Sequence, residues 1–235
     1  MATAVKDLTA PAPRRISRLG LLWRSTIGKK IIMAVTGLVL VLYVFAHLLG
    51  NLQVFAGPEK IDAYGRLLRA APALLWFARI VLLVAAVAHA WAGIELQLRA
   101  RRARGVAYAD YRPGASSVAS RTMLWSGLLL LGFVVYHVLD LTVGVVHPDF
   151  REGEIFHNVV VSFGRVLGVA IYLVSMAALG FHLWHGVYSM FQSLGLSNRR
   201  LTPQVQRFAA GLSVVLALGL ASIPIAVLVG VVKVS

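Results

Sequence analysis

Long apolar runs alternate with short polar and basic segments along the chain. A helix needs roughly 20 apolar residues to cross about 30 Å of hydrocarbon. Five runs are long enough, at about residues 30–55, 73–98, 122–146, 159–194 and 208–232. The fourth run exceeds one crossing, so we expect its helix to tilt or to project from the membrane. The pattern predicts an all-α integral membrane protein with five transmembrane helices.

The segments outside these runs leave no room for a second domain. Residues 1–28 form an N-terminal segment without an apolar core, so we expect no cleavable signal peptide. Residues 29–232 form the transmembrane domain. Between the first two runs, residues 58–70 could form a short surface helix that starts after Pro58.

The composition fits a membrane protein. Hydrophobic residues make up 59% of the chain and the mean hydropathy is +0.79, whereas soluble domains are about half apolar. Cysteine is absent, which excludes disulfides, thiolate catalysis and an iron–sulfur cluster ligated by these residues. The net charge of +14 sits at the ends of the runs, so we do not expect nucleic-acid binding.

The placement of basic residues predicts the orientation, because short cytoplasmic loops are enriched in Lys and Arg. They gather before the first run and in the second–third and fourth–fifth connections: Lys29, Lys30, Arg99, Arg101, Arg102, Arg104, Arg112, Arg121, Arg199, Arg200 and Arg207. The third–fourth connection leans acidic, with Asp149, Glu152 and Glu154. We therefore expect a cytoplasmic N-terminus and an outside C-terminus.

Five of the seven histidines lie within the apolar runs: His47, His89, His137, His182 and His185. Ionisable groups are costly inside a bilayer and usually serve a function. A histidine hydrogen-bonded to a neighbouring helix is the simpler alternative. Histidines on four of the five runs favour the functional reading.

Depth sorts these histidines into two pairs. His47 and His137 lie 17 and 16 residues beyond the last basic residue before their runs, or about 25 Å from the cytoplasmic edge. His89 lies 10 residues and His182 about 12 residues from the same edge, or about 15 to 18 Å. Each pair joins helices of the same direction, which lie diagonally opposite in an antiparallel four-helix bundle. Two imidazoles at one depth suit one six-coordinate haem iron, and the two pairs therefore suit two haems.

Other ligand chemistry fits less well. Zinc needs three or four ligands at one point, and a di-iron site needs several glutamates. Only Glu95 and Asp140 lie near the runs as carboxylates. Glycines at Gly50, Gly93 and Gly186 follow a histidine by three or four residues, which would let a flat haem approach the backbone, although they could equally serve helix packing.

The fourth ligand could be His182 or His185, because residues three apart can share a helix face. We favour His182, whose spacing to Gly186 repeats the spacing of His89 to Gly93. His185 then becomes a propionate or quinone contact.

Five segments stand out along the chain: STIGKK, HLLGNL, HAWAG, HLWHG and SMFQ at residues 25–30, 47–52, 89–93, 182–186 and 189–192. Together they resemble the cytochrome b membrane subunit of succinate dehydrogenase, in the single-chain, five-helix, two-haem form that some fumarate reductases share. The resemblance runs from about residue 23 to residue 196, and the fifth helix matches in position only.

This resemblance implies two haem b groups and reduction of a quinone, menaquinone being the expected kind. By resemblance, His89 and His182 ligate a proximal haem, while His47 and His137 ligate a distal one. A flavoprotein and an iron–sulfur subunit would dock on the cytoplasmic face of the bacterial membrane, in complexes that can form trimers. Some relatives carry a glutamate where this chain has Gly180, so a proton route through that side chain is not expected here.

Other polar residues allow more than one interpretation. Arg79 and Arg165 could pair with distal haem propionates or reach the outer headgroups. Asp140, three residues after His137, could orient a ligand, carry protons or reach the outer interface. Trp91 is expected to pack or lie at an interface.

Near the cytoplasmic end, Arg24 and Lys29 could hold proximal propionates or dock the iron–sulfur subunit, or simply anchor the first helix. Ser25 could contact a quinone or cap the first helix.

The sequence therefore predicts a dihaem cytochrome b that anchors a succinate:quinone oxidoreductase. Another dihaem anchor, of the hydrogenase or formate dehydrogenase type, is a second hypothesis. A haem-free transporter with a histidine relay is the third, but it should show broken helices or inverted repeats, and the sequence shows neither.

Overall fold

A computed structural model of the chain describes residue 20, residues 23–103 and residues 121–233. The predicted N-terminal segment therefore lies largely outside the described residues, as do Arg104 and Arg112. Within the described part the chain is helical and contains no strand, which confirms the all-α prediction.

Five helices are long and apolar enough to cross a membrane, as predicted. They are α2 (Thr26–Asn51), α4 (Pro72–Arg102), α6 (Met123–Val138), α8 (Val166–Ser193) and α9 (Thr202–Leu228). A short 3-10 helix, η1 (Leu52–Ala56), continues α2, and a π-helical turn, η2 (Leu139–Val143), continues α6. Large apolar side chains such as Leu42, Phe77 and Leu83 are exposed on the spans, as lipid-facing residues are in membrane proteins.

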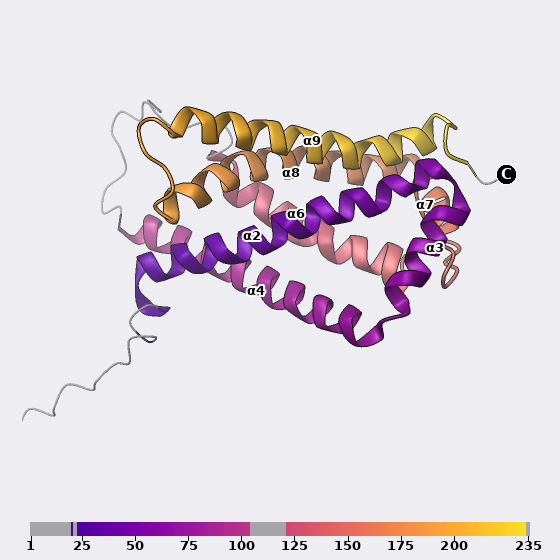
Figure 1. The fold of residues 1–235 in the computed structure, drawn as a ribbon, viewed down its shortest axis with the longest axis horizontal. Coiled ribbons are helices and arrows are strands. Elements are labelled where there is room, and N and C mark those ends of the chain that lie inside the picture. The colour runs from indigo at the N-terminus through magenta and orange to yellow at the C-terminus, as the bar shows by residue number, and fades with distance from the viewer. Residues whose placement is uncertain (1–19, 21–22, 104–120, 234–235) are drawn as a thin grey trace, which may run out of the picture.

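Four of these helices form a ring. The neighbouring pairs are α2–α4, α4–α6, α6–α8 and α8–α2, so α2 lies diagonally opposite α6, and α4 lies diagonally opposite α8. The fifth helix, α9, lies outside the ring along α8 and also contacts α2 (Figure 1). This arrangement is the predicted four-helix bundle with an additional fifth helix.

The fourth apolar run is not one helix, which corrects the prediction of a single long span. Its first part forms a separate short helix, α7 (Ile155–Phe163), and α8 begins only at Val166. Between them Gly164 ends α7, and Arg165 has an extended backbone, with φ −102° and ψ 125°. Glycine is a poor helix former, so the break falls where the helix is weakest. The 28 residues of α8 then cross the membrane alone.

The two ends of the bundle differ (Figure 1). We call the end where α2 begins and α4 finishes the proximal end, and the opposite one the distal end. The distal end is covered by α7 and by α3 (Pro58–Arg69), which begins with a proline in its first turn as the sequence indicates. The backbone N–H of Phe156 in α7 donates to Asp62 of α3 at 3.0 Å, which joins the two short helices.

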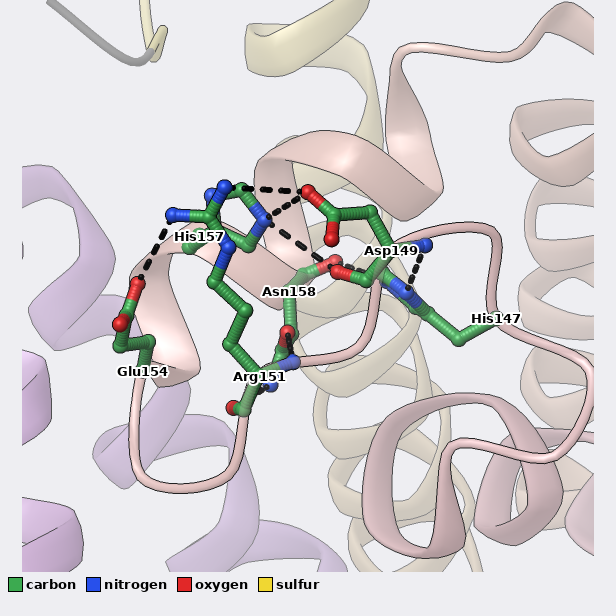
Figure 2. Close-up of polar contacts among 6 residues, drawn as sticks. All are labelled: His147, Asp149, Arg151, Glu154, His157 and Asn158. Carbon is green, nitrogen blue, oxygen red and sulfur yellow. Dashed lines mark hydrogen bonds and ion pairs between the residues drawn. The ribbon is translucent and has the colours of Figure 1, made fainter.

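The loop before α7 is cross-linked by polar side chains (Figure 2). Arg151 and Asn158 exchange two hydrogen bonds between side chain and backbone, at 2.9 and 2.8 Å. The backbone N–H of Asp149 donates to Nδ1 of His147, so Nε2 of this buried histidine donates to the Asn158 carbonyl at 2.9 Å. His147 thus holds the loop together.

The carboxylate of Asp149 accepts from His157 at 2.9 Å and from Arg151 at 3.2 Å (Figure 2). Partial desolvation raises the pKa of Asp149, but the hydrogen bonds from His157 and Arg151 together outweigh it and hold that pKa below its ordinary value. The charged form of this carboxyl group is therefore the one that the folded loop favours.

Candidate functional site

Four membrane histidines lie in two pairs inside the ring. The distal pair is His47 of α2 and His137 of α6, whose ring centroids lie 5.7 Å apart with planes at 85°. The proximal pair is His89 of α4 and His182 of α8, with centroids 6.2 Å apart and planes at 63°. Each pair spans a diagonal of the ring, and these are the couples that the depth count groups together.

The proximal histidines hold their Nδ1 protons against fixed acceptors. Nδ1 of His89 lies 3.0 Å from the Met33 carbonyl oxygen, which can only accept, so this nitrogen carries the proton. Nδ1 of His182 lies 3.3 Å from the Ser126 hydroxyl. That hydroxyl donates its own proton to the Met123 carbonyl at 3.1 Å, so it accepts from His182. Both rings therefore keep a lone pair on Nε2.

The distal histidines contact tyrosines instead. Nδ1 of His137 lies 3.0 Å from the Tyr172 phenol oxygen, and Nδ1 of His47 lies 3.5 Å from the phenol of Tyr43 on its own helix. Across the described part of the chain, Nε2 of none of the four paired histidines has a hydrogen-bond partner. Nε2 is thus the nitrogen that each ring can offer to a metal.

Glycines bring the proximal rings close to neighbouring backbones. A Cβ atom added at Gly37 of α2 would lie 3.1 Å from Cε1 of His89, and one added at Gly127 of α6 would lie 3.4 Å from Cε1 of His182. Neither glycine can be singled out from the sequence, because each contacts a histidine of a different helix.

The glycines that the sequence did single out behave differently from one another. A Cβ at Gly50 would approach the Tyr64 ring to 2.7 Å, so this glycine packs α3 against α2, which is the helix-packing role of its two predicted roles. A Cβ at Gly93 would meet only the Met33 sulfur, at 3.9 Å, and one at Gly186 would meet no atom within 4 Å. The faces of α4 and α8 beside the proximal pair are therefore uncrowded.

The donor set fits two bis-histidine haems. Two imidazoles that bind one metal from opposite sides, at metal–nitrogen bonds of roughly 2 Å, have ring centres about 6 Å apart. The observed separations of 5.7 and 6.2 Å are close to this value. Over residues 23–103 and 121–233, no three His, Asp or Glu side chains converge as a zinc or di-iron site would require.

His185 lies half-buried on α8, one turn beyond His182, and faces no second imidazole in the described residues. Arg79 is exposed, with its guanidinium 5.0 Å from the Trp76 ring centre. Arg165 is exposed at the start of α8. Their contacts with propionates stay predictions.

Lys29 is buried at the proximal end, beside a stacked pair of tryptophans. Its ammonium donates to the Trp23 carbonyl at 2.8 Å and lies 4.5 Å from the centre of the Trp91 ring. Trp23 and Trp91 stack at 4.6 Å, which confirms Trp91 as a packing residue. This cation–π arrangement is typical of a structural anchor for the first helix.

The neighbours of Lys29 also have local partners. The Ser25 side chain accepts from the Gly28 backbone N–H at 2.9 Å and caps α2, as one of its two predicted roles requires. Arg24 is exposed, and its carbonyl accepts from Arg99 at 2.8 Å. Glu95 forms an ion pair with Arg99 at 2.9 Å within α4, and it is the bond from Arg99 to the Arg24 carbonyl that ties the end of α4 to the start of α2.

Comparison with known proteins gives one match. A family model described as the succinate dehydrogenase/fumarate reductase transmembrane subunit matches residues 99–222. This region contains His137 and His182 but not their partners His47 and His89. No curated protein and no solved structure matches the chain.

Proposed function

Because the chain belongs to the succinate dehydrogenase/fumarate reductase transmembrane subunit family, we propose that it is the haem b-containing anchor of a succinate:quinone oxidoreductase. Its role is to relay electrons from an iron–sulfur subunit to a quinone, menaquinone being the expected kind. It is a multi-pass membrane protein. The dicarboxylate chemistry belongs to the soluble flavoprotein partner.

The observation that carries this proposal is the pair of imidazole couples across the diagonals of the ring. Haem, when bound, supplies one-electron redox chemistry. His47 and His137 would hold one group, and His89 and His182 the other, each through Nε2. Hydrogen bonds at Nδ1 fix the orientation of the rings and raise their basicity, as the partners of metal-bound histidines generally do.

The proximal end is the side on which we place the soluble partners. It carries Arg99, Arg101 and Arg102 at the end of α4, and Arg199, Arg200 and Arg207 around the start of α9. This enrichment supports a cytoplasmic position under the positive-inside rule, with the C-terminus on the outer side of a bacterial membrane. The pair His89 and His182 is then nearer to the docked iron–sulfur subunit.

Haem content tests the proposal. The chain is produced with its flavoprotein and iron–sulfur subunits, and haem b is counted per chain from the pyridine haemochrome spectrum. We expect two haems in the wild type, reduced by succinate, one in His182→Ala, and two in the matched control His185→Ala. A wild-type complex without a haemochrome spectrum would contradict the proposal, and so would loss of haem in His185→Ala but not in His182→Ala.

A further inference from the structure

The carboxyl group of Asp140 is completely buried near the distal pair. Its Oδ2 accepts from the Ser162 hydroxyl at 2.5 Å and from the Tyr172 phenol at 3.5 Å. Its Oδ1 has no hydrogen-bond partner among the described residues. A buried carboxyl group with an unsatisfied oxygen is costly, so its presence calls for an explanation beyond packing.

Three separate elements build this polar cluster. Asp140 lies in the π-helical turn η2, Ser162 in α7 and Tyr172 in α8. The break between α7 and α8 allows their close approach, because a Cβ at Gly168 would lie only 2.7 Å from the Ser162 carbonyl oxygen. Single π-helical turns occur frequently at functional sites. The cluster is thus assembled by the distinctive features of the distal end.

The cluster reaches His137 through one phenol. Tyr172 donates its single hydroxyl proton to Asp140, so its oxygen accepts from Nδ1 of His137 at 3.0 Å. Without the Asp140 carboxylate as its acceptor, the Tyr172 phenol could donate to Nδ1 of His137 instead, which would place the histidine proton on Nε2. The proton on Nε2 would then block the nitrogen that a haem iron requires.

We propose that Asp140 and Tyr172 are positioning residues for the distal haem. Asp140 holds the Tyr172 phenol as an acceptor, and the phenol fixes the tautomer of His137 and makes its Nε2 more electron-donating. This inference rests on the proposed function, in which His137 binds a haem. A more basic ligand favours the oxidised iron, so the hydrogen bonds that run from Asp140 through Tyr172 to His137 lower the midpoint potential of the distal haem.

The proximal pair supplies an internal reference. His89 donates to the backbone carbonyl of Met33, which no side-chain substitution at the distal end removes. Tyr136 supplies a matched control. The centre of its ring lies 6.2 Å from the centre of the Tyr172 ring, while no hydrogen bond joins it to His137 in the described structure.

A redox titration of both haems in the purified complex tests the proposal, with the two potentials assigned by His137→Ala, which should lack the distal haem. In Tyr172→Phe we expect the ratio of reduced to oxidised distal haem at a fixed potential to rise roughly tenfold. For a one-electron couple that is about 59 mV. Asp140→Asn should shift the ratio in the same direction by less. The proximal haem should not change in either variant, and Tyr136→Phe should leave both potentials unchanged.

Unchanged potentials in both Tyr172→Phe and Asp140→Asn, with two haems present, would overturn the inference and leave the proposed function standing. An equal shift of both haems would also overturn it, because a general loss of packing would then explain the effect. If Tyr172→Phe loses the distal haem, the redox titration of Asp140→Asn tests the inference on its own: a rise in the distal ratio of reduced to oxidised haem supports it, and an unchanged ratio overturns it. A wild type without haem, or two haems in His137→Ala, would instead contradict the proposed function.

Discussion

The two histidine pairs present the same nitrogen but are held in different ways. In the proximal pair, Nδ1 bonds to the Met33 carbonyl or to a serine hydroxyl that is itself tied to a carbonyl. In the distal pair, Nδ1 contacts phenols, and behind one of them lies the buried Asp140. The proximal rings also face glycine backbones, whereas the distal end is covered by α3 and α7.

This difference indicates two ways to fix a candidate ligand histidine in a helix bundle. A backbone acceptor is set by the helix itself, so only steric changes can disturb the His89 ring. A side-chain acceptor can be adjusted by substitution, so the distal ligand is open to tuning. Substitutions at the two ends should therefore affect one haem at a time.

The largest expected effect is at the distal end, in Gly168→Ala. The new Cβ would lie 2.7 Å from the Ser162 carbonyl oxygen, and backbone atoms there cannot yield cheaply. We expect a loss of about 1–3 kcal/mol of stability, typical of overpacking, and release of the distal haem before the proximal one. Thermal unfolding followed at the haem bands measures both. Simultaneous loss of the two haems would contradict independent ends.

A smaller effect is expected at the proximal end, in Gly37→Ala. Its Cβ would lie 3.1 Å from Cε1 of His89, so the imidazole must move by a few tenths of an ångström. We expect a loss of about 1 kcal/mol and an altered spectrum of the proximal haem alone. Gly132→Ala is the control, because a Cβ there meets no atom within 4 Å. Equal spectra for the two variants would show that His89 does not need its glycine neighbour.

The smallest effect concerns the distal loop and pH. The pKa of Asp149 is lowered in the folded chain, so its stabilising contribution is present above the unfolded value of about 4 and is lost as pH falls through the folded value. The effect is small because Asp149 is exposed to solvent. The melting temperature of the wild type should exceed that of Asp149→Asn near neutral pH and converge with it below about pH 3. A gap that widens on acidification would contradict this sign.

Much of the fold could be predicted because the membrane imposes one strong constraint, the length of an apolar run. The observed helix ends differ from the predicted ones by several residues. The helix α2 begins at Thr26 because Ser25 caps it, and α9 begins at Thr202 with a proline in its first turn. The break at Gly164 was not predicted, since one glycine and one arginine barely interrupt a long apolar run.

The histidine pairs could be anticipated because helical rise fixes the depth of each residue. Their partners could not, since Met33, Ser126 and Tyr172 lie on other helices and their contacts depend on how each helix is rotated. Asp140 shows the same limit. Sequence placed it near the outer interface as one option, whereas packing between η2, α7 and α8 buries it completely.

The central claim is that each diagonal pair holds one haem, and double substitutions test it most directly. Haem b is counted per chain in purified complexes of two variants. The account predicts that His47→Ala with His137→Ala retains one haem, because both changes fall in the distal pair. It predicts that His47→Ala with His89→Ala retains none, because each pair then lacks a ligand. One haem left in the second variant, or none in the first, would contradict the pairing.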